Sequence, residues 1–549
     1  MNLLTQAAAE AQSRGLLPPV AIPEPGLERP QNPEHGDYAS NLALKLARSA
    51  RMNPLVIANV LVDCLPPVDF VARVNAAPPG FINFTLNDGW LATQVDQIIQ
   101  TADSFGSVDV GRGSTVQVEF VSANPVGPLH IGSGRGGVIG DTLASVLAKA
   151  GYRVEREYYV NDAGSRMDAF YQTLYARYLQ VLGKEATVPE DGYHGQYMVE
   201  LAKQMVAAVG DRYLQMPRER AAPELGQLGM LRIVEEARAD LAAMGINYDT
   251  WFSEQSLYDR SLVSKVLEIL RERGYVDVRE GATWFASTVL GEDKDNVLVR
   301  SNGVPGYFAS DIAYHYNKFV ERGFAKVIDV WGADHQGHVP RMKAAVGALG
   351  IAPERLTVII YQLVTLRRGQ EIVRMSKRTG DIITLREVLE EVGADACRFF
   401  FLSRSADSQM DFDLELAKEQ SEKNPVYYVQ YAHARIASIL RLAEERGINF
   451  FDGDVSLLTS EPELTLIRKM LQLPELVDQV AGSLAPHPLP YYAQDLAGVF
   501  HTFYKQCRVV SHDPAEEAIT KARLKLVQAV KIVLANTLHL MGMTAPERM

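Results

Sequence analysis

The spacing of apolar and polar residues changes period along the chain, and each change marks an expected element. From Thr115 to Val121 apolar residues alternate with polar ones, which is typical of a β-strand. From Val138 to Ala150 apolar residues recur at helical spacing, and the run stops at Gly151. The segment between them, Ser122 to Ser133, contains two prolines and two glycines. The pattern therefore predicts a strand, a turn and a helix.

Strand and helix patterns continue to alternate from about residue 109 to about residue 405. Further strands are expected at Tyr152–Val160, Val327–Trp331 and Thr357–Val364. Strands separated by helices predict an α/β fold with a doubly wound, Rossmann-type parallel sheet. The segment from about 170 to 300 has mostly helical spacing, as at Leu228–Met244 and Ser261–Arg273. It predicts a largely helical insertion over the site.

The two ends of the chain have different patterns. Residues 1–108 combine helical spacing with two strand-like runs and predict an N-terminal α+β domain that ends in the glycine-containing break from Gly106 to Gly113. Residues 406–549 are helical in pattern and predict an all-α helix-bundle domain. With the segment 109–405 between them, a multidomain protein is expected, which a chain of 549 residues with 47% hydrophobic content can support.

Composition narrows the class of protein. The formal net charge of −12 argues against a protein that coats nucleic acid without specificity. Cys64, Cys397 and Cys507 are far apart, so neither a disulfide framework nor a zinc ribbon is predicted. The sequence has no apolar run long enough to span a bilayer and no basic and apolar leader pattern at its start. We therefore expect a cytoplasmic protein without membrane contact or a bound metal.

The turn between the first strand and helix is a candidate phosphate site. Free N–H groups at a helix start carry the positive end of the helix dipole and suit a polyphosphate, and His130 could reach a phosphate oxygen. The spacing of Gly132, Gly134 and Gly137 also fits the dinucleotide pattern G-x-G-x-x-G, with Glu155 or Glu157 as ribose ligand. A nicotinamide-dependent dehydrogenase is therefore an alternative, although its fold needs neither the prolines nor the histidine of this turn.

A second segment favours a different chemistry. Arg374–Gly380 is a basic loop between the expected strand at 357–364 and a helical pattern at Leu385–Val392. ATP chemistry needs a cation that neutralises the charge developing on the departing pyrophosphate. Lys377 is the candidate for this role.

Together the two segments resemble the HIGH and KMSKS motifs of class I aminoacyl-tRNA synthetases, here His130–Ser133 and Arg374–Arg378. Longer segments resemble the arginyl-tRNA synthetases of that class; they are residues 32–38, 118–125, 158–164, 332–335, 424–435 and 545–549. The resemblance spans nearly the whole chain. It implies a ligase that joins L-arginine to ATP, giving arginyl-adenylate and pyrophosphate, and then transfers arginine to the 3′-terminal ribose of tRNA(Arg).

The resemblance also assigns candidate site residues. Catalytic roles are expected for His130, Ser133 and Lys377. ATP is expected to contact His130, Gly132, Gly134, Gly332, His335, Arg374, Met375, Ser376 and Lys377. The arginine pocket is expected to contain Glu119, Asn124, Tyr307, Asp311 and Asp334, and Asp334 could instead border the ATP ribose. Carboxylates suit a planar guanidinium because they accept two charge-assisted hydrogen bonds. Contacts with tRNA are expected at Tyr427, Tyr431, Arg435 and Met549.

The partners that the resemblance implies are tRNA(Arg), L-arginine and ATP, with Mg²⁺ entering as part of the ATP substrate complex and no tightly bound cofactor. The N-terminal domain would contact the outer corner of the tRNA and the C-terminal domain its anticodon, and we expect a monomer. Ser133 replaces the second histidine usual in the family. This departure leaves open a non-catalytic tRNA-binding paralogue, and a class I synthetase for another amino acid is a further alternative.

Overall fold

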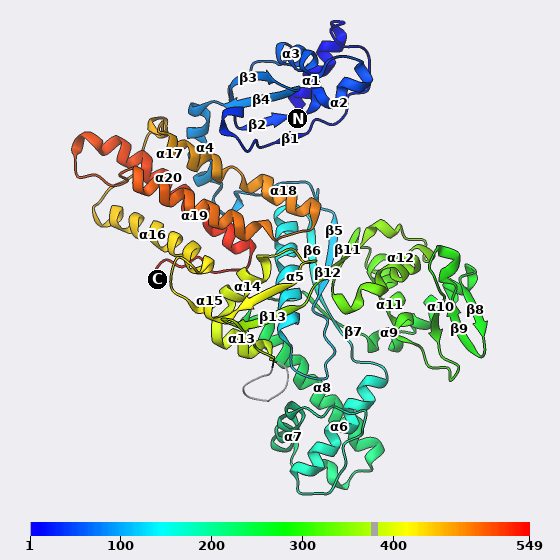
Figure 1. Ribbon diagram of the computed structural model, residues 1–549. Coiled ribbons are helices and arrows are strands. Elements are labelled where there is room, and N and C mark those ends of the chain that lie inside the picture. Colours follow the sequence, from blue (N-terminus) through cyan, green and yellow to red (C-terminus); the bar gives the residue numbers. More distant parts are fainter. Residues whose placement is uncertain (1, 375–382) are drawn as a thin grey trace. The chain divides into compact units, whose positions relative to one another are not determined.

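A five-stranded parallel sheet forms the centre of the larger of two compact units, residues 106–434, 473–497 and 534–549. The computed structural model describes residues 2–374 and 383–549 (Figure 1). The strands lie in the order β12-β11-β5-β6-β7, and each neighbouring pair is parallel. Their bounds are β5 Thr115–Phe120, β6 Arg153–Val160, β7 Thr250–Ser253, β11 Lys326–Gly332 and β12 Leu356–Tyr361. The predicted Rossmann-type fold is confirmed. The chain connections reverse direction between β5 and β11, the position at which such sheets bind ligands.

Strand β5 is buried on both faces. Val116 and Val118 are fully buried on one face, but Gln117 and Glu119 on the other are buried as well. The alternation alone suggested a polar, hydrated face, whereas helices cover both sides of a parallel sheet. The polar side chains of β5 must therefore find partners inside the protein.

Helix α5, Ile131–Lys149, follows the predicted turn and packs on the sheet. It begins earlier than the expected start at Val138, because its first turns are rich in glycine and lack an apolar period. Gly140 allows close contact with β5, since a Cβ at this position would lie 2.3 Å from the Phe120 side chain. The helix start is thereby fixed at the carboxyl end of β5.

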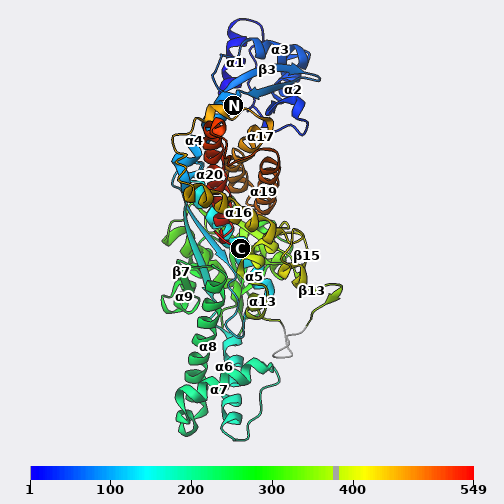
Figure 2. The ribbon, with the colours of Figure 1, turned by 90° about the vertical axis from the view of Figure 1, so that its left-hand side faces the viewer.

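The segment after β6 forms a helical bundle with its own apolar core (Figures 1 and 2). Its helices are α6 Ser165–Val181, α7 Gln196–Val209 and α8 Arg218–Ala243. The expected insertion at 170–300 is only partly helical, because it also contains β7 of the central sheet and an antiparallel sheet in the order β10-β9-β8. These strands are β8 Val276–Arg279, β9 Ala282–Phe285 and β10 Asn296–Val299. Strands of four residues are too short to reveal a period of two.

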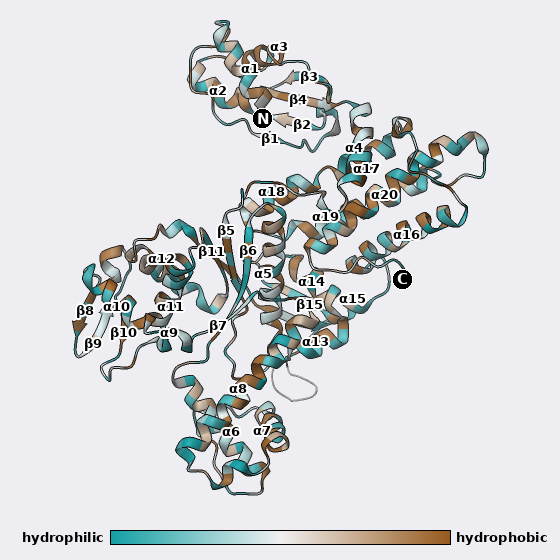
Figure 3. Cartoon of the chain, turned by 180° about the vertical axis from the view of Figure 1, so that it is seen from behind, coloured by the Kyte–Doolittle hydropathy of each residue, from teal (hydrophilic) through white to brown (hydrophobic). Residues whose placement is uncertain are grey.

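Between β7 and β12 the chain forms α9 Gln255–Asp259, α10 Leu262–Glu272, α11 Tyr307–Tyr316, the π-helical turn η5 Asn317–Glu321 and α12 Val339–Ala348. Helix α10 buries Leu262, Val263, Val266 and Leu270 on one side. Figure 3 shows the corresponding separation of brown, hydrophobic residues from teal, hydrophilic ones on the helices. This two-sided pattern is what the helical spacing in the sequence predicts.

A small mixed sheet and short helices follow the central sheet in the same unit. The strands are β13 Val364–Arg368, β14 Glu371–Ile372 and β15 Met410–Asp413, and the helices are α13 Leu385–Val392, α14 Ala394–Leu402 and α15 Leu414–Lys418. Buried Arg398 of α14 donates a hydrogen bond to the Asp141 carboxylate of α5. The C-terminal helices are α16 Pro425–Glu445, α17 Glu461–Met470, α18 Leu473–Ser483, α19 Pro488–Gln506 and α20 Glu517–Leu540.

The second compact unit comprises residues 1–105, 435–472 and 498–533. It contains an antiparallel sheet, in the order β1-β2-β4-β3, and helices that cover it. The strands are β1 Leu27–Glu28, β2 Tyr38–Ser40, β3 Val71–Ala77 and β4 Phe81–Leu86, and the helices are α1 Asn2–Ser13, α2 Leu42–Ala50, α3 Pro54–Asp63 and α4 Asp88–Thr101. Arg468 of α17 forms an ion pair with Asp37 at 2.8 Å. The N-terminal α+β and C-terminal helical folds are thus as predicted.

Candidate active site

The turn that follows β5 holds a strained backbone. Val121 and Ser122 have φ angles of 69° and 42°, a region that costs residues other than glycine about 1–3 kcal/mol. Three hydrogen bonds stabilise Ser122 in this conformation. Its Oγ donates to Glu119 Oε1 at 2.8 Å and accepts from the Tyr159 N–H at 3.1 Å. Its carbonyl oxygen accepts from Asn161 Nδ2 at 2.9 Å. These bonds fix the direction in which the chain leaves the sheet.

His130 caps the first turn of α5. Its Nδ1 accepts a hydrogen bond from the Ser133 N–H at 3.3 Å, which leaves the other ring nitrogen directed away from the helix. Gly132 is required by this arrangement, since a Cβ there would lie 2.9 Å from the His130 ring. Burial lowers the pKa of His130, and the nearby Asp334 carboxylate partly opposes this. The imidazole is therefore neutral near pH 7 and can donate one hydrogen bond to a ligand.

Asp334 and His335 lie at the carboxyl end of β11, next to β5 in the sheet. The two side chains are 3.4 Å apart at their charged atoms, and 80% and 54% of their respective surfaces are exposed. Gly332 precedes them, and a Cβ at this position would lie 2.6 Å from Asp334 Oδ1. The structure thus places Gly332, Asp334 and His335 at the carboxyl edge of the sheet, as it does His130, and their contacts with ATP or arginine stay predictions.

The chain that follows the second motif, from Thr384 onward, is joined to the first motif. The Leu385 N–H donates to the Leu129 carbonyl at 2.8 Å, and Thr384 forms a β-bridge with His130. Thr384 also caps α13 in a reciprocal capping box with Glu387. The chain that follows the basic segment is therefore attached directly to the histidine turn, although about 250 residues separate them in sequence.

Three of the predicted ATP contacts, Met375, Ser376 and Lys377, lie outside the described residues. Arg374 is exposed at the end of the described segment that precedes them. Ser133 is buried, with its N–H bonded to His130. A Cβ at Gly134 would lie 2.7 Å from the Leu385 side chain, so a glycine here allows α5 to pack closely on α13. The predicted contact of Gly134 with ATP stays a prediction.

A buried ionic cluster lies beneath the turn. Lys318 Nζ donates to Glu119 Oε2 at 2.5 Å and to Asp329 Oδ1 at 2.9 Å, and the lysine side chain is fully buried. His315 Nε2 lies 2.9 Å from Asp329 Oδ2, and the Lys318 ammonium lies 4.1 Å from the centre of the Tyr314 ring. Both oxygens of Glu119 therefore already accept hydrogen bonds from the protein, one from Lys318 and one from Ser122.

Opposite charges in this cluster shift one another's pKa values and so oppose the effect of burial. Burial alone would raise the pKa of Asp329, but Lys318 and His315 lower it to about 2. Burial also dominates at Glu119 and raises its pKa, although Lys318 opposes the shift. Burial alone would lower the pKa of Lys318, yet the carboxylates raise it above its usual value. The lysine stays charged and holds Glu119 in one position.

A second acidic group borders the same site. Burial raises the pKa of Asp311 to about 6, with His315 lowering it and Glu119 raising it. Burial likewise raises the pKa of Glu254 to about 7, despite a hydrogen bond that its Oε1 accepts from Ser310 at 2.7 Å. Among the described residues, Glu254 Oε2 is buried without a partner at good hydrogen-bond geometry, although the Tyr159 side chain lies close enough to lower the pKa of Glu254. Burial thus raises the pKa values of two carboxylates that interact with one another.

The remaining predicted pocket residues lie closer to solvent. Tyr307, at the start of α11, is 43% exposed, and its ring lies 5.8 Å from the Arg166 guanidinium carbon. Asn124 is exposed on the turn after β5. Asp311 is one helical turn beyond Tyr307 on α11. Tyr307 and Asp311 therefore lie on the same helix, α11, whereas Asn124 lies on the turn between β5 and α5 that also bears His130.

Sequence reasoning missed Lys318, Asp329 and Glu254. Asp329 interrupts the apolar run at 327–331, and a lone carboxylate inside a buried strand could have indicated a buried partner. Lys318 gave no such signal, because its burial depends on a π-helical turn that the sequence pattern does not reveal. Glu254 follows the four-residue strand β7, which the pattern also missed.

The predicted tRNA contacts fall on α16 and the C-terminus. Tyr427 and Tyr431 stack with ring centres 5.9 Å apart, and Tyr431 is 39% exposed. Tyr427 and Met549 line one hollow of about 490 Å³, together with Asp395 and Gln430. This hollow combines an aromatic ring, an apolar side chain and hydrogen-bonding groups.

Arg435, the fourth predicted contact, lies in the smaller unit, where its guanidinium carbon is 4.6 Å from the centre of the Tyr504 ring. The structure therefore brings Tyr427 and Met549 together and gives Arg435 a packing contact with its own unit.

The dehydrogenase alternative fails on the position of its acidic residues. Glu155 lies near the start of β6 and accepts from Thr250 and Arg322. Glu157 is buried within the sheet and accepts from Gln117 at 2.6 Å. A ribose ligand would need to lie at the carboxyl end of the strand. Neither glutamate can therefore serve a dinucleotide there.

Sequence comparisons agree with this geometry. Residues 94–411 match the family described as "tRNA synthetases class I (R), catalytic domain", residues 2–86 match "Arginyl tRNA synthetase N terminal domain", and residues 429–549 match "DALR anticodon binding domain". The chain belongs to the arginyl-tRNA synthetase family.

Relatives of this family cover the full chain. The arginine--tRNA ligase of Dehalococcoides mccartyi is 58% identical over 546 residues, which is 100% of this chain and 98% of the relative. That of Caldanaerobacter subterraneus is 51% identical over 552 residues, again with 100% and 98% coverage. The structure of Thermus thermophilus arginyl-tRNA synthetase superposes with a TM-score of 0.79 at 25% identity, covering 100% of this chain and 99% of that one. The His130 turn and the carboxylate cluster thus belong to a synthetase fold.

None of the helices in residues 2–374 and 383–549 is long and apolar enough to cross a membrane. No group of three or more histidine, cysteine, aspartate or glutamate side chains in the same ranges is arranged to hold a metal ion.

Proposed function

We propose that this chain activates L-arginine with ATP and transfers it to tRNA(Arg). The observation that carries the proposal is that the capped α5 start lies at the switch point of the sheet, and that two buried, mutually interacting carboxylates, Asp311 and Glu254, accompany it in the same unit. The helix start suits phosphate and the carboxylates suit a guanidinium. One site therefore offers both substrates of an arginine-adenylating reaction.

In the first step the arginine carboxylate attacks the α-phosphate of ATP, the bond to the β-phosphate breaks, and pyrophosphate leaves. No protein nucleophile is needed, so the protein acts by positioning and by stabilising charge. We assign the free ring nitrogen of His130 to the α-phosphate and the N–H groups of the α5 start to the phosphate chain. Lys377 and Arg374 would neutralise the leaving pyrophosphate, and ATP would enter as its Mg²⁺ complex.

Arginine would lie between the two turns. Asp311 and Glu254 would accept hydrogen bonds from the guanidinium, and Tyr307 would cover it from the solvent side. Glu119, whose oxygens accept from Lys318 and Ser122, would form the floor of the pocket. Asn124 and Asp334 would serve the amino-acid head group or the ribose. A buried carboxylate oxygen without a partner at good hydrogen-bond geometry favours Glu254 for the first role over Glu119.

Aminoacylation tests the proposal directly. The purified chain, incubated with unfractionated tRNA, ATP and one labelled amino acid at a time, is expected to charge tRNA with arginine only. Charging with another amino acid in preference to arginine would support the synthetase alternative. Full-length folded protein that charges tRNA with none of them would support the non-catalytic paralogue.

The pH dependence of arginine binding follows from the raised pKa values. Only ionised carboxylates pair with the guanidinium, and the charged forms of Glu254 and Asp311 are lost as the pH falls through about 7 and about 6. The KM for arginine is therefore expected to rise by up to about tenfold per pH unit between about pH 7 and about pH 6, and more steeply below about pH 6, with a smaller change for the KM of ATP. Initial rates of aminoacylation between about pH 8 and about pH 5.5 measure this. A KM for arginine that stays constant over the range would remove both residues from guanidinium binding.

We further propose that the anticodon reaches the hollow beside Tyr427 and Met549, and that the N-terminal domain, 1–108, contacts the outer corner of the tRNA. The catalytic and anticodon-binding domains would be 109–405 and 406–549. The formal charge of −12 requires the tRNA contacts to be local. We propose a cytoplasmic monomer.

Tyr431→Ala tests the tRNA surface. Stacking of a base on an aromatic ring is worth about 1–3 kcal/mol, so the KM for tRNA(Arg) is expected to rise about tenfold or more. The KM values for arginine and ATP should stay within about twofold, because the substitution lies outside the carboxylate cluster. Tyr431→Phe is the matched control, since it keeps the ring and should retain the affinity. If the alanine and phenylalanine variants behave alike, Tyr431 does not stack on the tRNA.

A further inference from the structure

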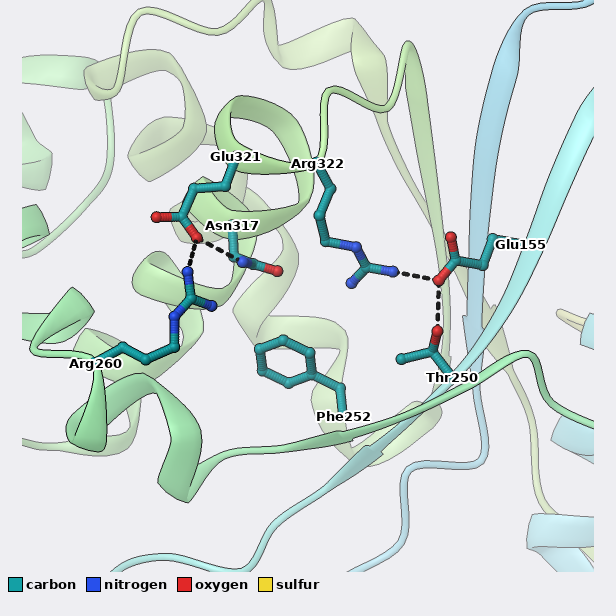
Figure 4. A pocket seen from close by; sticks show the side chains of 7 residues that line it. All are labelled: Glu155, Thr250, Phe252, Arg260, Asn317, Glu321 and Arg322. Atoms are coloured by element: carbon teal, nitrogen blue, oxygen red, sulfur yellow. Dashed lines mark hydrogen bonds and ion pairs between the residues drawn. The ribbon is translucent and has the colours of Figure 1, made fainter.

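A separate cavity lies against the central sheet near the starts of β6 and β7. Its volume is about 380 Å³, and Figure 4 shows the side chains that line it: Glu155, Thr250, Phe252, Arg260, Asn317, Glu321 and Arg322. The candidate active site lies at the opposite, carboxyl ends of the strands. None of the roles assigned above uses this cavity.

The charged residues of the cavity are already paired. Arg260 Nη2 lies 2.6 Å from Glu321 Oε2, and Arg322 Nη2 lies 2.5 Å from both Glu155 Oε1 and Glu157 Oε2. The two arginines and two glutamates of the lining cancel in charge. The cavity therefore favours an uncharged ligand over a phosphate or another ion.

Two polar atoms of the lining are left over. Asn317 Oδ1 and Arg322 Nη1 are buried without a hydrogen-bond partner in the described ranges, and Asn317 is only 3% exposed. Figure 4 shows these two atoms pointing toward one another across the cavity, with the Phe252 ring beside the space between them. Buried polar atoms are normally hydrogen-bonded, so one free acceptor and one free donor mark a place for a bound molecule.

We propose that this cavity binds a nucleobase. Its flat ring would pack on Phe252, and its edge would offer an acceptor to Arg322 Nη1 and a donor to Asn317 Oδ1. Each nucleobase carries hydrogen-bond donors and acceptors at different positions around its ring, and aromatic side chains stack on its flat face. An amino acid would instead bring two full charges into a lining whose charges are satisfied. A free nucleoside and an unpaired base of RNA offer the same chemistry.

Two short series of residue contacts link the lining of the cavity to the proposed arginine pocket. Asn317 is followed in the π-helical turn by Lys318, which holds Glu119 and Asp329. Arg322 pairs with Glu157, which in turn accepts from Tyr314 at 2.5 Å. A base that engages Asn317 and Arg322 would fix the turn that positions Lys318. This part of the inference rests on the proposed function: a base bound in the cavity lowers the KM for arginine, because it fixes the turn that carries Lys318.

Binding is tested first, without turnover. Full-length protein with saturating ATP, which blocks the nucleotide site, is titrated with adenosine, cytidine, guanosine or uridine and observed by saturation-transfer NMR and calorimetry. At least one nucleoside is expected to bind with a Kd of about 1 mM or below. Asn317→Ala and the milder Phe252→Leu should each weaken binding about tenfold, while Asn59→Ala, which removes an exposed helical asparagine elsewhere, should not. Thermal unfolding confirms that each variant is folded.

Two outcomes overturn the site: no nucleoside binds to the parent protein, or the parent and both cavity variants bind equally, as expected when a water molecule alone bridges Asn317 and Arg322. A short single-stranded RNA that binds more tightly than each nucleoside identifies RNA as the source of the base, and weaker binding identifies the free nucleoside. The coupling has its own readout, a KM for arginine that falls about fivefold with bound nucleoside in the parent and not in Asn317→Ala. An unchanged KM together with confirmed binding refutes the coupling alone, and a chain inactive in aminoacylation still reports on the site.

Discussion

His130→Ala is expected to lower the rate of arginyl-adenylate formation by about 10²- to 10³-fold. The substitution removes a positioned, neutral hydrogen-bond donor from the place where charge develops on the α-phosphate, and such donors contribute about this factor. It also removes the cap that accepts from the Ser133 N–H. The rate is measured by single-turnover formation of adenylate at saturating ATP and arginine.

Loss of the cap could also reduce stability, so two comparisons separate the effects. His130→Asn keeps a side chain that can cap the helix and should restore stability but not the rate. His512→Ala, at an exposed histidine of the smaller unit, should change neither. If His130→Ala forms adenylate at a near-normal rate, the histidine has no role at the phosphate.

Asp311→Asn is expected to lower kcat/KM for arginine by about 30- to 5,000-fold. Truncating one partner of a buried, hydrogen-bonded charge pair costs about 2–5 kcal/mol, because the guanidinium would lose a charged acceptor in a buried position. The neutral analogue citrulline gains nothing from the carboxylate, so its rate should change little and the preference for arginine over citrulline should fall. Aminoacylation kinetics with both compounds measure the effect.

Asp293→Asn is a matched control at an exposed aspartate, and it should leave both rates unchanged. An Asp311→Asn variant that keeps the full preference for arginine over citrulline would show that the guanidinium binds elsewhere. Glu254→Gln should act in the same direction as Asp311→Asn, since the two carboxylates lie close enough to interact.

Patterns of neighbouring residues predicted those parts of the site whose structure depends mainly on residues close in sequence. The strand, turn and helix around His130 follow from alternation, proline and glycine content, and a helical period that stops at Gly151. The relation between His130 and the segment near Lys377 came from the family resemblance, and the structure shows its physical basis in the Leu129–Leu385 hydrogen bond. Lys377 itself lies outside the described residues, and its role stays a prediction.

Long-range packing decided what the sequence could not predict. Gly134 fits a phosphate motif by spacing, but its environment is set by Leu385, far along the chain. Glu119 was expected to be free for arginine, whereas Lys318 reaches it from a π-helical turn. Glu254 was missed because β7 is too short for a recognisable period. In each case the partner is distant in sequence, so no local pattern can identify it.

ATP–pyrophosphate exchange with each of the twenty amino acids, and with citrulline, tests most directly whether this pocket selects arginine for adenylation. The reactions are run with and without tRNA(Arg), because the family resemblance implies that tRNA is required for activation. We predict exchange with arginine in the presence of tRNA(Arg), and little with lysine or citrulline. Faster exchange with another amino acid, or equal exchange with citrulline and arginine, would contradict a pocket built on Asp311 and Glu254.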